Sequence, residues 1–214
     1  MIYEYPPVTD PLRQGDVFLS LPRVDLSLKH VPVITADDAQ VDMSWDDIVQ
    51  QGDVVTAVLP LRPVAAIVVS QDCDAARAPD ITLCEIRAFC DVERKCENVT
   101  SSSRLVKIIT QHARLNQKWF YLPPDQQIGF ADRMGADFHM TLRVPHSELA
   151  DLRHLRRGRL NDVAVAHFRE RIAEFFRRYA YNEWYPLSPA EMNEYKRDYP
   201  DAEPYPWQVV PHTA

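Results

Sequence analysis

One short stretch of the chain, SQDCD, concentrates residue types that could carry out chemistry. Ser70, Asp72, Cys73 and Asp74 lie close together, and Arg77 follows within the same turn, residues 70–77. A cysteine thiolate can act as a nucleophile, and it forms most readily beside a cation or a helix N-terminus. The two aspartates disfavour a thiolate and only Arg77 favours one, so Cys73 is a candidate nucleophile in an acidic setting. The other polar side chains of this turn are candidate binding groups.

Metal binding is a second interpretation of the same region. All four cysteines lie within 24 residues, and thiolates are common ligands of tetrahedral zinc. The intervals between them are ten, five and five residues, whereas zinc-binding pairs usually enclose about two to four. Cysteines that simply fill a core are the alternative. Asp72, Asp74 and Asp80 could instead bind Mg²⁺ or Ca²⁺ through oxygen atoms. We assign neither a metal nor a cofactor from these patterns.

Two further candidates lie on the apolar segments that flank the turn. Arg62 opens the segment RPVAAIVVS, and Glu85 lies within ITLCEIR. RNA cleavage through the 2′-hydroxyl needs a base for the proton and a cation for the phosphorane. Arg62 could be that cation, and Glu85 or His112 could be the base. In the alternative interpretation, Arg62 pairs with one of the nearby acids and Glu85 is an exposed strand residue.

A long amphipathic segment near the C-terminus offers a different surface. Residues 161–181 carry apolar side chains at three- and four-residue steps, which predicts a helix with one apolar stripe. That stripe is expected to pack on a sheet, although it could also form an interface with a partner. The arginines of this helix are candidate contacts for a phosphate or an acidic partner: Arg169, Arg171, Arg177 and Arg178. Glu174 lies within helical reach of Arg171, so part of this charge is expected to be paired internally.

The charge distribution restricts the classes of partner. The formal net charge is −7, and residues 1–100 carry 17 acidic against 8 basic side chains. A domain that grips nucleic acid through its phosphates is usually basic, so only a local RNA contact is expected. No apolar run is long enough for a membrane span, and the N-terminus lacks the pattern of a signal peptide. We therefore expect a soluble, cytoplasmic protein with reduced cysteines.

The expected elements change in character along the chain. Period-two and continuous apolar runs predict β-strands as far as about residue 144, including the segments 14–21, 64–70, 80–89, 103–110 and 137–144. A short helix is expected at 44–51, capped by Ser44. Helices are then predicted at 147–157, 161–181 and 188–199, and the Pro-rich end is expected to be an extended arm.

The first half of the chain resembles the MazF/PemK-type toxins. The match is carried by Gly15-Asp16 at the start of a strand, by Arg62-Pro63 before an apolar strand, and by Ser70 at its end. It covers about residues 13–90. The resemblance implies an SH3-like barrel that cleaves single-stranded RNA without a metal. Three departures stand out. The insert before Arg62 is longer than in the compact toxins, Glu85–Arg87 occupy the place of the catalytic threonine, and the helical C-terminal third has no counterpart.

Together these patterns predict an α+β protein. A curved antiparallel, SH3-like β core with an insert is expected over residues 1–145, followed by a helical subdomain and Pro-rich arm over 146–214. We favour a binding or regulatory module of a bacterial toxin or defence-type system, with the 70–77 turn and the 161–181 helix as contact surfaces. The alternative is a metal-independent endoribonuclease of the MazF/PemK type that uses Arg62. A protein partner or homo-oligomer is expected, and no membrane.

Overall fold

The computed structural model describes residues 2–96, 99, 101–110, 118–177, 189–198 and 200. The chain forms two compact units, Met1–Phe175 and Phe176–Ala214. In the described part of the second unit, the helix α7 (Pro189–Asp198) matches the helix expected at 188–199. None of the described helices is long and apolar enough to cross a membrane.

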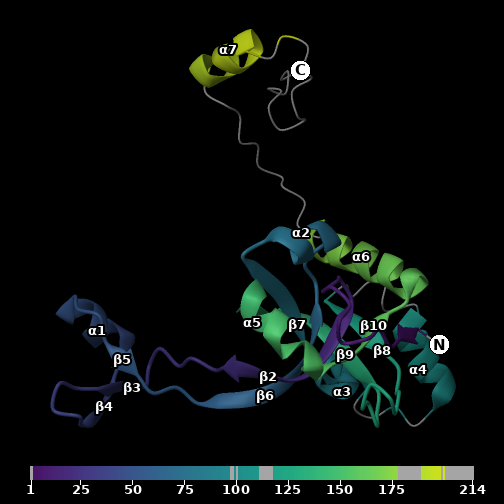
Figure 1. The fold of residues 1–214 in the computed structure, drawn as a ribbon, viewed down its shortest axis with the longest axis horizontal. Coiled ribbons are helices and arrows are strands. Elements are labelled where there is room, and N and C mark those ends of the chain that lie inside the picture. The colour runs from purple at the N-terminus through teal and green to yellow at the C-terminus, as the bar shows by residue number, and fades with distance from the viewer. Residues whose placement is uncertain are drawn as a thin grey trace. The chain divides into compact units, whose positions relative to one another are not determined.

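A seven-stranded antiparallel sheet organises the first unit (Figure 1). The strand order is β1-β10-β2-β6-β7-β9-β8. The strands are β1 (Tyr3–Glu4), β10 (Arg156–Leu160), β2 (Asp16–Val24), β6 (Leu61–Val68), β7 (Asp80–Ala88), β9 (Met134–Pro145) and β8 (Trp119–Leu122). The prediction of a mixed α+β fold is thus confirmed. Over the described residues the sheet is open, with β1 and β8 at its edges, and does not close into a barrel.

Both faces of the sheet are covered, which explains why its central strands are continuously apolar. Adjacent residues of a strand point to opposite faces. Val17 packs in one core together with Phe168 of α6 (Asp162–Arg177). Phe18 packs in a second core together with Ala75 of α2 (Asp72–Arg77) and Leu149 of α5 (His146–Asp151). The sheet therefore holds α2 and α6 through separate cores. The predicted boundary between a β core and a helical subdomain after residue 145 stays a prediction. The first compact unit continues past that position to Phe175.

A third core corrects one predicted element. Residues 103–110 were expected to form a strand, but they lie in the helix α4 (Ser102–Thr110). Leu105, Ile108 and Ile109 follow helical spacing, and they pack with Phe89 and Trp119. Helical periodicity therefore outweighs β propensity here. Phe89 begins the short helix α3 (Phe89–Val92), which the 3₁₀ turn η1 (Arg94–Cys96) follows.

The strand β10 was missed because its residues are mostly charged. Arg156 and Arg157 were expected to form the end of the helix at 147–157, but only α5 and the 3₁₀ turn η3 (Leu152–Leu155) are helical there. Two of its arginines, Arg156 and Arg159, are buried and have acidic and carbonyl partners instead of apolar ones. The helix α6 begins where expected and is described to Arg177. Residues 178–181 of the predicted helix and most of the predicted arm lie outside the described residues.

Residues 25–60, which we call the insert, lie between β2 and β6. They form a small sheet of order β4-β3-β5, from β3 (Val31–Ile34), β4 (Gln40–Met43) and β5 (Thr56–Ala57), and the helix α1 (Trp45–Gln51). Val31, Val33 and Ile48 are its buried core. The predicted helix is confirmed. Ser44 caps it through a capping box with Asp47, and Gly52 ends it with a φ of 72°.

Candidate functional site

The predicted turn at 70–77 contains a six-residue helix, α2. Ala75 anchors it in the core, while Cys73, Asp74 and Arg77 are exposed. Ser70, just before the helix, is half-buried, and its Oγ accepts a hydrogen bond of 2.9 Å from the Thr82 amide. The exposed side chains of this stretch are therefore displayed on a short helix whose inner face is fixed.

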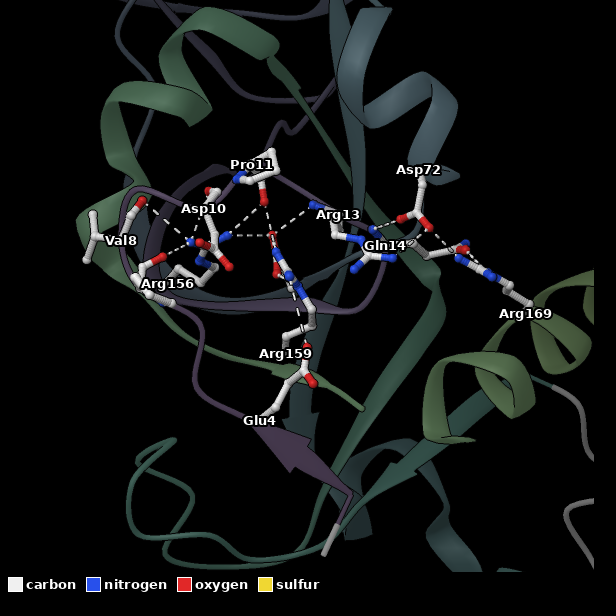
Figure 2. A network of polar contacts seen from close by, with 12 residues as sticks. Glu4, Val8, Asp10, Pro11, Arg13, Gln14, Asp72, Arg156, Arg159 and Arg169 are labelled. Atoms are coloured by element: carbon white, nitrogen blue, oxygen red, sulfur yellow. Dashed lines mark hydrogen bonds and ion pairs between the residues drawn. The ribbon is translucent and has the colours of Figure 1, made fainter. Parts of the chain in front are cut away.

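Asp72, the first residue of α2, joins three segments that are distant in the sequence. Its Oδ1 accepts a hydrogen bond of 2.9 Å from the Gln14 amide. Its Oδ2 lies 2.6 Å from Nη2 of Arg169 on α6 and 3.7 Å from Nη2 of Arg13 (Figure 2). The candidate binding residues Asp72 and Arg169, which are 97 positions apart, are thus brought into direct contact.

The buried Gln14 connects this group of contacts to the end of β6 and to Arg169. Its side chain is buried, its Nε2 donates to the Val69 carbonyl at 2.8 Å, and its Oε1 accepts from Nε of Arg169 at 2.6 Å. Both ends of the amide are therefore satisfied, and Arg169 is held by two acceptors in a fixed orientation. We call Arg13, Gln14, Asp72 and Arg169 the α2–α6 junction.

The junction keeps Asp72 ionised. Burial alone would raise the pKa of the Asp72 carboxyl, but the Gln14 amide, Arg169 and Arg13 outweigh burial and hold that pKa below its usual value. The side chains of Arg13 and Arg169 remain 48% and 47% exposed. The junction therefore consists of one carboxylate, that of Asp72, and two guanidinium groups that remain accessible to solvent.

Beside the junction lies a fully buried ionic cluster on Asp16, the residue that follows Gly15. Asp16 is 0% exposed, and it accepts hydrogen bonds from Nη1 of Arg156 at 3.1 Å and from Nε of Arg159 at 2.5 Å. Arg156 also donates to the carbonyl oxygens of Pro7 and Asp10 at 2.6 and 3.1 Å (Figure 2). The cluster therefore fastens the segment that leads into β2.

Arg156 and Arg159 were not anticipated as interacting residues. An indication was present, since Asp16 begins a buried strand and needs a cationic partner there.

Two glycines allow the strands to approach. Gly15 has a φ of 86°, and its carbonyl accepts from the Leu160 amide at 3.0 Å. A Cβ at Gly158 would lie 2.3 Å from Cδ1 of Ile128.

The two predicted catalytic residues Arg62 and Glu85 form a separate ion-pair cluster. Glu85 is 3% exposed, and its two oxygens accept hydrogen bonds from Nη1 and Nη2 of Arg62 at 2.9 and 3.0 Å. Nε of Arg62 donates to Asp25 at 2.6 Å. Nη1 of Arg23 lies 2.9 Å from Oε2 of Glu85 without hydrogen-bond geometry. One buried carboxylate is thus shared by two arginines.

This arrangement defines what the cluster can do chemically. The hydrogen bonds that Arg62 donates to Glu85 and, to a smaller extent, to Asp25 raise the pKa of Arg62 above its usual value, so its guanidinium stays charged. The Arg62 side chain is 43% exposed, so it can also meet an anion from solvent. Both oxygens of Glu85 are occupied by Arg62, and a proton-accepting role would require one of these hydrogen bonds to be exchanged.

Arg171, another predicted contact residue, has different partners from Arg169. Arg171 is two positions from Arg169, and therefore points to another side of α6. Its Nη1 donates to Glu174 at 3.0 Å, and its guanidinium lies 6.0 Å from the centre of the Trp119 ring. Arg177 is exposed in the last turn of α6 and belongs to the second compact unit. Arg178 and His112 lie outside the described residues.

The cysteines divide into two environments. Cys73 and Cys90 are exposed, whereas Cys84 and Cys96 are buried, and all four are free thiols. Burial is the main cause that raises the pKa of Cys84 to about 12 and that of Cys96 to about 11. Within the described ranges, no three His, Cys, Asp or Glu side chains are grouped closely enough to hold a metal ion.

No known protein-family model matches the chain, and a search of curated proteins found no match either. The function of the molecule is accordingly argued from its contacts, above all from those of the α2–α6 junction.

Proposed function

We propose that the protein is a binding or regulatory module of a bacterial toxin or defence-type system, and that α2 and α6 form its contact surface. The observation that carries this proposal is the 2.6 Å ion pair between Asp72 and Arg169. Because of it, the two elements that the sequence indicates as contact surfaces are adjacent and mutually fixed. A pre-organised surface loses less conformational entropy on binding.

The chemistry of this surface supports a protein partner. On α2 the exposed side chains Asp74 and Arg77 carry opposite charges, and Arg13 and Arg169 are half-exposed around Asp72. Exposed charges of both signs favour specific, complementary contact with another protein or with a second copy of the chain. The arginines also allow a local contact with RNA phosphates.

The alternative function is a metal-independent endoribonuclease with an SH3-like core, built on Arg62. The observation that favours it is the direct contact of Arg62 with Glu85, which puts a cation beside a carboxylate. The same contact also has a simpler role, since it neutralises a buried charge where β6 meets β7. We therefore rank the binding module first.

Site-specific cross-linking in the bacterium that carries the gene tests the binding surface. A photoreactive amino acid is placed at Cys73, at Arg77 or, as a control, at Val106 on α4, which is 56% exposed. We expect one protein adduct of the same mass from both α2 positions and none from Val106. Adducts of equal yield at all three positions, or none on α2, would contradict the proposal.

A parallel assay separates the two functions. Purified protein is incubated with a mixed, unstructured RNA, with and without EDTA, as wild type and as Arg62→Ala. The binding module predicts intact RNA in every sample. Cleavage that persists in EDTA and disappears in Arg62→Ala would establish the nuclease instead. Cleavage that EDTA abolishes would point to the aspartates of the 70–77 segment as ligands of a metal.

A further inference from the structure

The helix α1 of the insert exposes part of its apolar stripe. Trp45, Ile48 and Val49 lie at positions i, i+3 and i+4, so they share one side of the helix. Ile48 is buried against Val31 and Val33, but Trp45 is 48% and Val49 59% exposed. The small core of the insert therefore uses only the middle of this stripe.

Exposed apolar side chains are concentrated throughout the insert. Of the 13 large hydrophobic side chains that are exposed among the described residues, seven lie between residues 25 and 60. This segment makes up 36 of the 214 residues of the chain. The seven exposed side chains include Leu26, Val54 and Val58, at 58%, 102% and 48% exposure. Isolated exposed apolar residues are ordinary, but such a concentration indicates an interaction surface.

The same segment is strongly acidic. It contains seven aspartates and one lysine, which gives it a formal charge of −6 with histidine neutral. Asp25 is paired with Arg62, and Asp42 lies 2.9 Å from His30. Asp37, Asp46 and Asp53 are exposed, and no cation in the described part of the chain pairs with them. The insert thus carries both exposed apolar side chains and uncompensated negative charge.

We propose that the insert is a docking site for a positively charged protein segment that presents an apolar anchor to Trp45 and Val49. Charge complementarity selects this partner, because like charges repel nucleic acid from the insert and lysines or arginines are attracted to it. An exposed tryptophan is the residue type that most often dominates such contacts. This inference concerns a surface separate from the α2–α6 junction and does not depend on it.

The test uses the full chain and two synthetic amphipathic helical peptides, one made of leucine and lysine and the other of leucine and glutamate. Binding is measured by calorimetry, and hydrogen exchange locates the contact. We expect the lysine peptide to bind and protect residues within 25–60, and the glutamate peptide not to bind. Trp45→Ala and Val49→Ala should each weaken binding about tenfold or more, whereas Val106→Ala should change it less than twofold.

A charge variant tests the acidic surface separately from the apolar stripe. Asp46→Lys combined with Asp53→Lys leaves the apolar stripe intact and should weaken binding of the lysine peptide by at least about tenfold. The proposal is overturned if the peptide fails to bind, if protection lies outside 25–60, or if the Trp45 variant binds like wild type. A concentration-dependent dimer that Trp45→Ala abolishes would overturn it in favour of a second copy as the occupant.

Discussion

Arg62 on β6 holds Glu85 on β7 through two hydrogen bonds, of 2.9 and 3.0 Å, and Arg23 on β2 approaches the same carboxylate. Arg23 and Arg62 are cross-strand partners. Two like charges at paired positions repel each other, and the carboxylates of the buried Glu85 and of Asp25, which pairs with both arginines, offset this repulsion. The three residues connect three adjacent strands at the end of the sheet where the insert begins.

Removal of the Glu85 charge should therefore destabilise the fold. Glu85→Gln removes the buried carboxylate that Arg23 and Arg62 share, while the more exposed Asp25 still pairs with both arginines. We expect a loss of about 1–3 kcal/mol in the free energy of unfolding. Urea denaturation measures this loss. Glu148→Gln, at an exposed position on α5, is the matched control and should change the midpoint little. Equal midpoints for the two variants would show that the cluster contributes no stability.

The same substitution should destabilise the protein strongly at Arg156 of β10 and only slightly at the adjacent Arg157. Arg156 is buried on Asp16 and on several carbonyl oxygens, whereas Arg157 is exposed. Arg156→Leu should lower the unfolding free energy by about 2–4 kcal/mol, and Arg157→Leu by less than about 0.5 kcal/mol. Hydrogen exchange should also rise in residues 5–14 of the first variant alone. Unchanged exchange there would contradict the role of Arg156.

Asp72 gives the α2–α6 junction a defined pH dependence. Its pKa is lowered in the folded state, so its contribution to stability is fully present above the usual aspartate pKa of about 4 and is lost as the pH falls through the lower folded value. Asp72→Asn should lose about 1 kcal/mol at pH 7, because its partner Arg169 is half-exposed.

The difference between wild type and Asp72→Asn should shrink in acid, below about pH 4. Chemical denaturation across a pH series measures it, with Asp74→Asn as the control on the same helix. A difference that stays constant down to pH 2 would contradict the ionic contribution of Asp72.

The four cysteines should divide into two kinetic classes. Cys73 and Cys90 are exposed, whereas Cys84 and Cys96 are buried and burial raises the pKa of each thiol. At pH 7.5 we expect iodoacetamide to modify Cys73 and Cys90 in the native protein, and the other two only after unfolding. Peptide mass spectrometry identifies the modified sites. Rapid modification of Cys84 in native protein would show that its strand opens readily.

The sequence patterns predict the apolar framework well and the polar strand poorly. The runs around Ile67 and Leu83 and the stripe through Phe168 produce the expected strands and helix, because burial of apolar residues determines both pattern and structure. The strand β10 cannot be predicted from apolar patterns, because most of its residues are charged. Its buried arginines, Arg156 and Arg159, are stabilised by Asp16, which lies 140 positions away from Arg156. Only the fold brings these partners together.

For the candidate site as well, local sequence indicates the residues but not their partners. Asp72, Arg62, Glu85 and Arg169 could be selected by residue type and neighbours, but their pairings could not be predicted. The pairing depends on strand order and on the packing of α6, which are long-range features. Gln14 was overlooked for a different reason, since a lone glutamine carries no chemical signature until its acceptors and donors are known.

The insert enters and leaves the main sheet at one point. It is bounded by Val24 and Leu61, which are cross-strand partners in the β2–β6 pair, so its two ends lie side by side. The insert also has a small core of its own, around Ile48. A segment with adjacent ends can be shortened, lengthened or exchanged while the register of the main sheet is preserved. The main sheet can therefore accommodate a different segment between β2 and β6 without a change in its strand pairing.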